Sequence, residues 1–285
     1  MLTMRLLVTG AAGMLGTDVV AAASGHDVVA LARADLDITD ADAVRAAVRD
    51  SQPDAVINCA AWTNVDAAET EEAQATRING DGAGHLAAAA AEVGAHIVHV
   101  STDYVFDGAA TSPYLEDAPT GPIGAYGRSK LAGEIAVRDG APESHAIVRT
   151  AWVFGPHGKN FVDTMLRLGA ERDELTVVDD QVGCPTFTGH LAEALVELID
   201  AHALPLGVVH MAATGSCSWY EFAREVLTSG GVRCELRPGD SADLARPARR
   251  PAYSVLASDW GPIVPRLPEW REGVAEYMSA GMPAA

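Results

Sequence analysis

Five short apolar runs divide the first half of the chain, and each is followed by a stretch of helical composition. Runs of four to six apolar residues without polar alternation are typical of parallel strands that are buried on both faces. The expected strands are residues 5–9, 28–31, 55–58, 96–100 and 146–150. Because strands and helices alternate regularly, we predict an α/β fold with a Rossmann-type, doubly wound parallel sheet.

The expected helices lie between and after these strands. They cover about 14–24, 41–51, 72–93 and 126–137 in the first half of the chain, and 191–201, 219–227 and 269–280 in the second. The pattern loosens after Pro156, although a strand at 208–211 is expected to return to the sheet. We therefore predict a dinucleotide-binding domain over 1–155, completed by about 189–212, and a smaller, discontinuous substrate-binding lobe formed mainly by 156–285.

A glycine-rich turn follows the first strand. Its glycines, Gly10, Gly13 and Gly16, have the spacing G-x-x-G-x-x-G and lead into a predicted helix. Glycine permits a tight turn and a close approach of the backbone to a pyrophosphate, which then sits at the helix N-terminus. Strand, turn and helix in this order predict a dinucleotide site near the start of the chain.

The end of the second strand carries no acidic residue. An acid there would favour NAD(H) by binding the adenosine ribose, but the chain has Ala32 and Arg33. An arginine can pair with a 2′-phosphate, so we predict NADPH as the cofactor. NADH is the alternative if Arg33 is only a solvated loop residue. Nearby, Asp37 could reach the adenine amine, whereas Asp40 could equally cap the next helix.

Tyr126 and Lys130 lie four residues apart in a predicted helix, which places them on one face. A phenol with a pKa of about 10 is a poor acid at neutral pH, and an ammonium beside it should lower that pKa. Lys130 is one of only two lysines, against eighteen arginines, which indicates that this position needs an ammonium. The alternative is an exposed helix face on which both residues are incidental.

Two further strand ends carry candidate residues. Ala60, Ala61 and Trp62 follow the third strand, where open α/β sheets bind ligands and small side chains let a cofactor pass closely. Thr102 follows the fourth strand. Its hydroxyl could hydrogen-bond a carbonyl group, although threonine also has a high β propensity of its own.

The charge balance excludes two classes of partner. Asp and Glu total 39 and Lys and Arg 20, which gives a net charge of −19 and an isoelectric point near 4.7. Such a surface repels nucleic-acid phosphate and anionic membranes, so we expect neither as a partner. The acidic, lysine-poor and alanine-rich composition resembles that of extreme halophiles. An acidic surface for a basic partner is the alternative.

The cysteines indicate the compartment. They have no metal-ligand or redox spacing, so we expect free thiols in a reducing cytoplasm. The four are Cys59, Cys184, Cys217 and Cys234. The first strand begins almost at the start of the chain, so we expect no signal peptide, and no apolar run is long enough to span a bilayer.

Several motifs together resemble the extended short-chain dehydrogenase/reductases. They are the turn at 10–16, the segment Ser101-Thr102-Asp103-Tyr104-Val105-Phe106 and the Tyr126/Lys130 pair. Four more stretches resemble the dTDP-4-dehydrorhamnose reductase family within that superfamily, namely 58–66, 149–155, 180–186 and 249–254. The resemblance covers nearly the whole chain. It implies a cytoplasmic, NADPH-dependent oxidoreductase that reduces the 4-keto group of a nucleotide-activated 6-deoxyhexulose in dTDP-L-rhamnose synthesis.

The resemblance also implies roles for individual residues. Tyr126 would protonate the oxygen at carbon 4, Lys130 would hold the nicotinamide ribose and lower the tyrosine pKa, and Thr102 would polarise the ketone. The implied cofactor contacts, besides Tyr126 and Lys130, are Gly10, Gly13, Met14, Leu15, Asp37, Ile38, Ala60, Ala61 and Trp62. Arg33 joins this set as the candidate for the 2′-phosphate. The implied sugar contacts are Tyr104, Val105 and Trp152. The candidates for the diphosphate are Asn160, Lys159, Arg249 and Arg250. Core packing is the alternative for Trp152, and surface charge or a structural clasp for the diphosphate set.

The metal and the reaction type leave alternatives open. Some family members join subunits through magnesium bound by clustered glutamates, but Gly189 and His190 stand where such a cluster is expected. We therefore predict no metal and leave a homodimer open. Tyr104 stands where sugar-nucleotide dehydratases carry a glutamate base, and Met14 where epimerases usually carry an aromatic residue. A non-catalytic cofactor-binding regulatory subunit of this fold is the alternative of another class.

Overall fold

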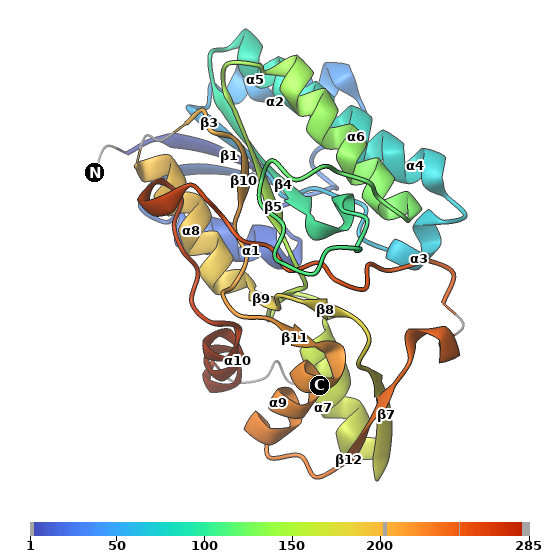
Figure 1. Ribbon diagram of the computed structural model, residues 1–285. Helices are drawn as coiled ribbons and strands as arrows, with labels where there is room; N and C mark the ends of the chain where they lie inside the picture. Colours follow the sequence, from blue (N-terminus) through green and yellow to red (C-terminus); the bar gives the residue numbers. More distant parts are fainter. Residues whose placement is uncertain (1–2, 202–203, 245, 281–285) are drawn as a thin grey trace.

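A six-stranded parallel sheet forms the centre of the larger part of the molecule (Figure 1). The computed structural model describes residues 3–201, 204–244 and 246–280. In the order in which they pair, the strands are β10 (Gly207–His210), β5 (His145–Thr150), β4 (His96–Thr102), β3 (Ala55–Asn58), β1 (Arg5–Thr9) and β2 (Asp27–Leu31). All five pairings are parallel. The predicted Rossmann-type α/β sheet is confirmed.

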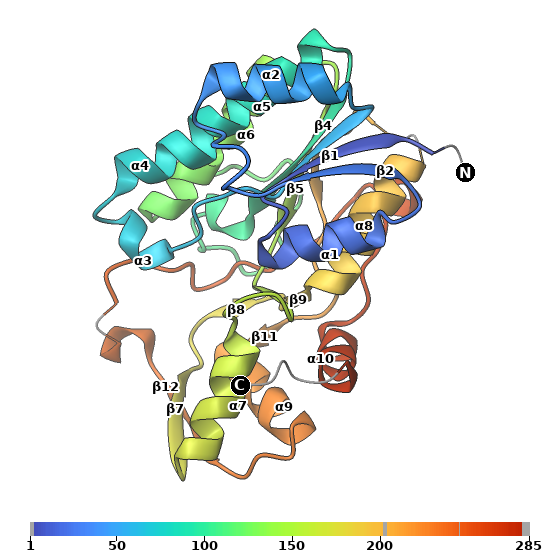
Figure 2. The same cartoon turned by 180° about the vertical axis from the view of Figure 1, so that it is seen from behind.

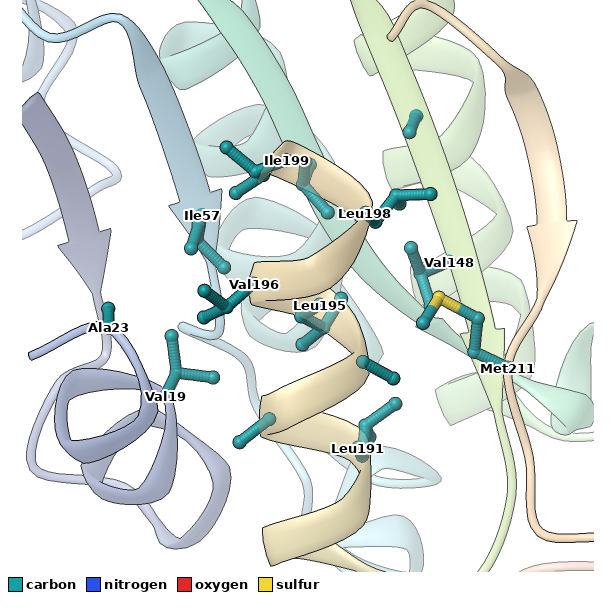
Figure 3. Close-up of a cluster of buried hydrophobic side chains, with 14 of the residues drawn as sticks. Val19, Ala23, Ile57, Val148, Leu191, Leu195, Val196, Leu198, Ile199 and Met211 are labelled. Atoms are coloured by element: carbon teal, nitrogen blue, oxygen red, sulfur yellow. The ribbon is translucent and has the colours of Figure 1, made fainter. Parts of the chain in front are cut away.

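Helices cover both faces of this sheet (Figures 1 and 2). One face carries α1 (Met14–Ala22) and α8 (Thr188–Asp200), and the other α2 (Ala41–Ser51), α5 (Gly82–Glu92) and α6 (Ala125–Gly140). Figure 3 shows the core under α8, where Leu195 and Leu198 lie among Val19 of α1, Ile57 of β3 and Val148 of β5. All five side chains are buried, so this layer removes a large apolar surface from water. Within the described residues, none of the helices is both long and apolar enough to cross a bilayer.

The helix expected over 72–93 is interrupted. A first segment, α4 (Glu72–Thr76), passes through a π-helical turn at Arg77–Asp81 into α5. Such turns frequently mark functional positions. Here the turn presents the buried Asn79, whose side chain accepts a hydrogen bond from Trp62 N (2.7 Å) and donates to the Ser129 hydroxyl (2.8 Å). The turn therefore fastens the segment after β3 to α6.

The smaller lobe contains three helices. It also contains a pair of strands that the sequence did not predict. The helices are α7 (Phe161–Glu171), α9 (Trp219–Ser229) and α10 (Trp270–Ser279). Strand β7 (Glu174–Val178) pairs in parallel with β12 (Glu235–Gly239). The Pro238-Gly239 end of β12 favours a turn by composition, which is why this strand was missed. The remaining short elements are α3 (Val65–Ala68), β6 (Val153–Phe154), β8 (Val182–Gly183), β9 (Thr186–Phe187), β11 (Cys217–Ser218) and the 3₁₀ turns at 103–105, 241–243 and 261–263.

The two parts of the molecule are interleaved along the chain. Helix α8 and strand β10 belong to the large sheet, yet they follow the first segment of the smaller lobe. A later segment then returns, with isolated bridges from Leu256 to Tyr114 and from Tyr253 to Val182. We therefore propose a two-part division with 189–212 assigned to the first domain.

A buried ion pair fastens α6 to the centre of the sheet. Arg149 of β5 donates from Nε to Glu134 Oε1 (2.9 Å) and from Nη2 to Glu134 Oε2 (2.7 Å). The Ser101 hydroxyl of β4 also donates to Glu134 Oε1 (2.6 Å). The Glu134 side chain is fully buried and that of Arg149 is 3% exposed. Removing one partner would leave the other charge without compensation.

We predict that Glu134→Gln lowers the free energy of unfolding by about 3–5 kcal/mol, as breaking a buried ion pair typically does. The measurement is urea denaturation followed by circular dichroism. Glu171→Gln is the matched control, because its i,i+4 partner Arg167 lies on an exposed helix face, and its effect should stay within about 0.5 kcal/mol. Equal effects of the two variants would show that the buried pair does not hold α6.

Candidate active site

Two cavities lie along the carboxyl ends of the parallel strands, where open α/β sheets bind their ligands. One, of about 320 Å³, lies beyond β1, β2 and β3. The other, of about 490 Å³, lies beyond β4 and β5 and extends to α6. Gly13, Cys59 and Ala61 line both. The two cavities therefore meet at the glycine-rich turn, and we call them the outer and the catalytic cavity.

Most of the predicted cofactor residues line the outer cavity. They are Gly10, Gly13, Arg33, Asp37, Ile38, Ala60, Ala61 and Trp62. The remaining four, Met14, Leu15, Tyr126 and Lys130, line the catalytic cavity. Gly10 has a φ of +69°, and a Cβ there would lie 2.6 Å from Ala60 N. Only glycine fits this turn, and the surface that it leaves open at the start of α1 suits a pyrophosphate.

Two arginines flank Asp37 in the outer cavity. Hydrogen bonds from the backbone and hydroxyl of Thr39 hold the Asp37 pKa below its usual range, and the charges of Arg33 and Arg77 act in the same direction. The residue Arg77, in the π-helical turn, is a wall residue that sequence reasoning missed. Asp40 is a cap, because it accepts hydrogen bonds from the backbone N–H groups of Asp42 and Ala43.

The catalytic cavity brings together residues that were predicted to take part in the reaction or to contact the sugar. Thr102, Tyr104, Tyr126, Lys130 and Trp152 all line it, although they come from three separate segments. Both Tyr126 and Lys130 lie in α6 and face the cavity, as their spacing predicted. The Tyr104 ring packs edge-on against Tyr126, with 5.8 Å between ring centroids.

The electrostatic environment of Tyr126 differs from the expectation that Lys130 lowers its pKa. Burial raises the Tyr126 pKa to about 12, and the Asp103 charge adds to this, whereas the Thr102 side chain acts in the opposite direction through a hydrogen bond. The Lys130 amine instead donates to Val100 O at 2.7 Å. Burial therefore favours the neutral, protonated form of the Tyr126 phenol.

Asp103, in the segment 101–106, is a buried carboxylic acid. Nothing in the sequence pattern indicated a role for it. It is 2% exposed, and burial raises its pKa to about 7. The Thr102 hydroxyl donates to Asp103 Oδ1 at 2.9 Å and accepts from Tyr104 N at 3.2 Å. A hydroxyl carries one proton, so the protonation state of Asp103 decides whether Thr102 can donate elsewhere.

Two stacked indole rings line the catalytic cavity, and one of them comes from the smaller lobe. Trp152 has a φ of +46°, an uncommon conformation for a residue with a side chain. Its ring stacks on Trp219 of α9 at 3.6 Å with an interplanar angle of 6°. Trp219 was predicted only as part of a helix. It also lines a third cavity, of about 590 Å³.

The basic, proline-rich stretch near residue 250 lines the third cavity. Arg246, Arg249 and Arg250 line it, and Arg250 also pairs with Asp66 through two hydrogen bonds of 3.2 and 3.0 Å. Arg250 therefore acts as the structural clasp that was the alternative to a diphosphate contact, since it holds this stretch against Asp66. The other lysine, Lys159, lines the catalytic cavity.

Two predicted substrate contacts lie elsewhere. Val105 is fully buried in an apolar cluster with Phe106 and Tyr114, since its side chain points away from both cavities into the core. Asn160 caps α7, accepting from Asp163 N at 3.0 Å and donating to Gly155 O at 2.9 Å. It lines none of the three cavities, because helix capping uses its side-chain groups. Among the described residues, no cluster of three or more His, Cys, Asp or Glu side chains could hold a metal ion.

Comparison with known proteins identifies the family. The model of the RmlD substrate binding domain family matches residues 4–282. A dTDP-4-dehydrorhamnose reductase of Streptomyces griseus is 48% identical, over 97% of this chain and 93% of its own length. A dTDP-4-keto-6-deoxy-D-glucose reductase of Streptomyces niveus is also 48% identical, over 90% of each chain. The crystal structure of the Bacillus anthracis dTDP-4-dehydrorhamnose reductase in complex with NADP superposes with a TM-score of 0.94, at 37% identity, over 98% of this chain and all of the other. The chain therefore belongs to the RmlD substrate binding domain family, the family of the dTDP-4-dehydrorhamnose reductases that its motifs indicated.

Proposed function

We propose that the protein uses NADPH to reduce the 4-keto group of a dTDP-activated 6-deoxyhexulose, converting dTDP-4-dehydrorhamnose to dTDP-L-rhamnose. The observation that carries this proposal is the convergence of Thr102, Tyr126 and Lys130 in a cavity continuous with the glycine-rich turn. The names of relatives that span nearly the whole chain support it, as does the NADP complex of the Bacillus anthracis relative.

The residues of the two cavities divide the work of the reaction. NADPH, when bound, supplies the hydride. The turn at Gly10 and Gly13 would receive its pyrophosphate, and Arg33 would pair with its 2′-phosphate. Tyr126, whose pKa is about 12, gives its proton to the substrate oxygen as negative charge develops there. Thr102 stabilises the same oxygen by a hydrogen bond when its hydroxyl no longer donates to Asp103.

The third cavity fits the nucleotide end of the substrate. It adjoins the catalytic cavity at Trp219 and carries Arg246 and Arg249, which suit a diphosphate. Trp152 and Tyr104 then face the sugar between the two. Relatives of equal identity are named for two different keto sugars, so the sugar is the part of this assignment that needs direct measurement.

The assay is NADPH oxidation by the purified protein, followed by absorbance, with dTDP-4-dehydrorhamnose and dTDP-4-keto-6-deoxy-D-glucose as separate substrates. Product identity is read by NMR. We expect faster turnover of dTDP-4-dehydrorhamnose. Faster turnover of dTDP-4-keto-6-deoxy-D-glucose would change the substrate assignment and leave the assigned reaction, reduction of a 4-keto group, unchanged. Absence of turnover with either sugar, in low and in molar salt, would favour a cofactor-binding regulatory subunit.

We predict that Tyr126→Phe lowers kcat by ~10²–10⁴, because the variant loses the proton donor but keeps the ring. NADPH binding, measured by fluorescence titration, should stay within a few-fold of the wild type. Tyr220→Phe is the control, since Tyr220 lies on α9 and lines none of the three cavities. A Tyr126→Phe variant with near wild-type kcat would remove Tyr126 from the mechanism.

We predict that the wild type prefers NADPH to NADH and that Arg33→Ala reduces this preference by about tenfold or more. A charge-assisted hydrogen bond to a phosphate is worth roughly 1.5–3 kcal/mol. The measurement is kcat/KM for each cofactor. Arg49→Ala is the control, because Arg49 is an exposed arginine at the end of α2 that pairs with Asp50. Equal kcat/KM values for both cofactors in the wild type would contradict the assignment of Arg33.

We also propose that the protein works in a salt-rich cytoplasm, on the basis of its net charge of −19. At about 0.01 M salt the Debye length is roughly 30 Å, so surface carboxylates repel one another across the molecule, whereas at about 1 M it is roughly 3 Å. Self-repulsion opposes the compact state. The melting temperature should therefore rise with KCl concentration, as measured by calorimetry. A flat or falling melting temperature would show an ordinary acidic enzyme and leave the catalytic assignment unchanged.

A further inference from the structure

A line of buried polar side chains runs beneath the catalytic cavity from β1 to α6. The Thr9 hydroxyl donates to Asn58 Oδ1 at 2.9 Å, Asn58 Nδ2 lies 3.0 Å from His99 Nδ1, and His99 Nε2 lies 3.4 Å from Lys130 Nζ. None of the four side chains is more than 2% exposed. Each comes from a different element, so the line crosses three strands before it reaches the helix that carries Tyr126.

The backbone fixes the direction of the hydrogen bonds in this line. Ala60 N–H donates to Asn58 Oδ1 at 3.0 Å, and a backbone N–H can only donate, so Oδ1 and Nδ2 of Asn58 cannot be exchanged. The group that faces His99 is therefore an amide NH₂, which has no acceptor. His99 Nδ1 must then be unprotonated, and the neutral ring carries its hydrogen on Nε2, facing Lys130.

The surroundings keep this ring neutral. Burial, and then the charge of Lys130, lowers the His99 pKa well below its usual range. Lys130 itself has a pKa of about 8, because burial lowers it more than the charge of Glu134 on the same helix raises it. The Cys59 thiol is neutral, since burial raises its pKa to about 12. His99 thus presents an N–H donor to an ammonium whose pKa is already lowered by burial.

We propose that His99, locked in one tautomer by Asn58, is a positioning residue for the reduction, holding the Lys130 amine against Val100 O and making it ready to release a proton. This inference rests on the proposed roles of Tyr126 and Lys130. Each turnover transfers one proton from Tyr126 to the substrate oxygen and leaves a phenolate. Lys130 lines the same cavity as Tyr126. In this proposal its ammonium, opposed by an N–H group, gives up a proton that returns to the phenolate through that cavity, and a proton from solvent then restores the ammonium.

The first test reads the tautomer and does not depend on catalysis. The ring ¹⁵N shifts of the holoenzyme with NADP⁺ are measured between about pH 5.5 and 9, and His99 is assigned by the loss of its signals in His99→Gln. We expect a neutral ring protonated on Nε2 throughout, as the pairing with the Asn58 amide requires. A ring protonated on Nδ1, or one that titrates in this range, overturns the inference even if the enzyme is active.

The second test reverses the polarity of the line. Asn58→Asp is isosteric, and its carboxylate would accept from Nδ1–H, leaving Nε2 as an acceptor for the Lys130 ammonium. We expect the alkaline limb of the kcat–pH profile to move up by about one pH unit or more, because the ammonium gains a partner in place of an opposing donor. KM for both ligands should change less than kcat.

A matched control separates this effect from loss of stability. His145→Gln removes another buried histidine, whose Nδ1 lies 2.7 Å from Ala141 O outside the cavities, and it should leave the alkaline limb in place. If Asn58→Asp does not fold, His99→Gln takes its place with the same expected direction of shift. A folded variant of Asn58 or His99 with an unchanged alkaline limb overturns the inference, as does an equal shift in the control.

Discussion

Helix α6 can carry the active site only because it lies closer to its neighbours than a helix covered with Cβ atoms could. A Cβ at Gly127 would collide with the Tyr104 carbonyl, and one at Gly133 would collide with the Asn79 carbonyl. These contacts bring the helix against the end of β4 on one side and against the π-helical turn on the other. The placement of Tyr126 and Lys130, which we propose as catalytic residues, depends on that close packing. So do the buried ion pair of Glu134 and the approach of Lys130 to His99.

The large sheet was predictable, and candidate site residues could be placed at its strand ends, because both signals are local. An apolar run, a glycine turn and a Tyr/Lys spacing each lie within a few residues, and the strands and Asp40 cap follow from them. The family resemblance then added substrate contacts. Thr102, Tyr104, Tyr126, Lys130 and Trp152 lie together in one cavity. Val105 and Asn160 lie elsewhere, because a motif reports neighbours in sequence and cannot distinguish a side chain that points into the core.

What the sequence could not supply depends on burial and on distant segments. The Tyr/Lys spacing correctly predicted a shared helix face, but the pKa of Tyr126 is set by burial and by Asp103, which spacing alone does not indicate. The β7–β12 pair joins residues about sixty positions apart, and its second strand contains Pro238. Trp219 of α9 stacks on Trp152, which lies far earlier in the chain. None of these contacts has a signature in a short window.

The interleaving of the two parts limits how the protein can change. Strand β10, which pairs with β5 at the edge of the large sheet, follows the first segment of the smaller lobe and precedes the rest of that lobe. The returning segment then binds the parts together again at Tyr114 and Val182. A new substrate preference therefore cannot be obtained by exchanging a C-terminal module as a single block. A chimera with a relative would have to exchange several separate segments at once, so specificity in this architecture is expected to diverge by point substitution around the cavities.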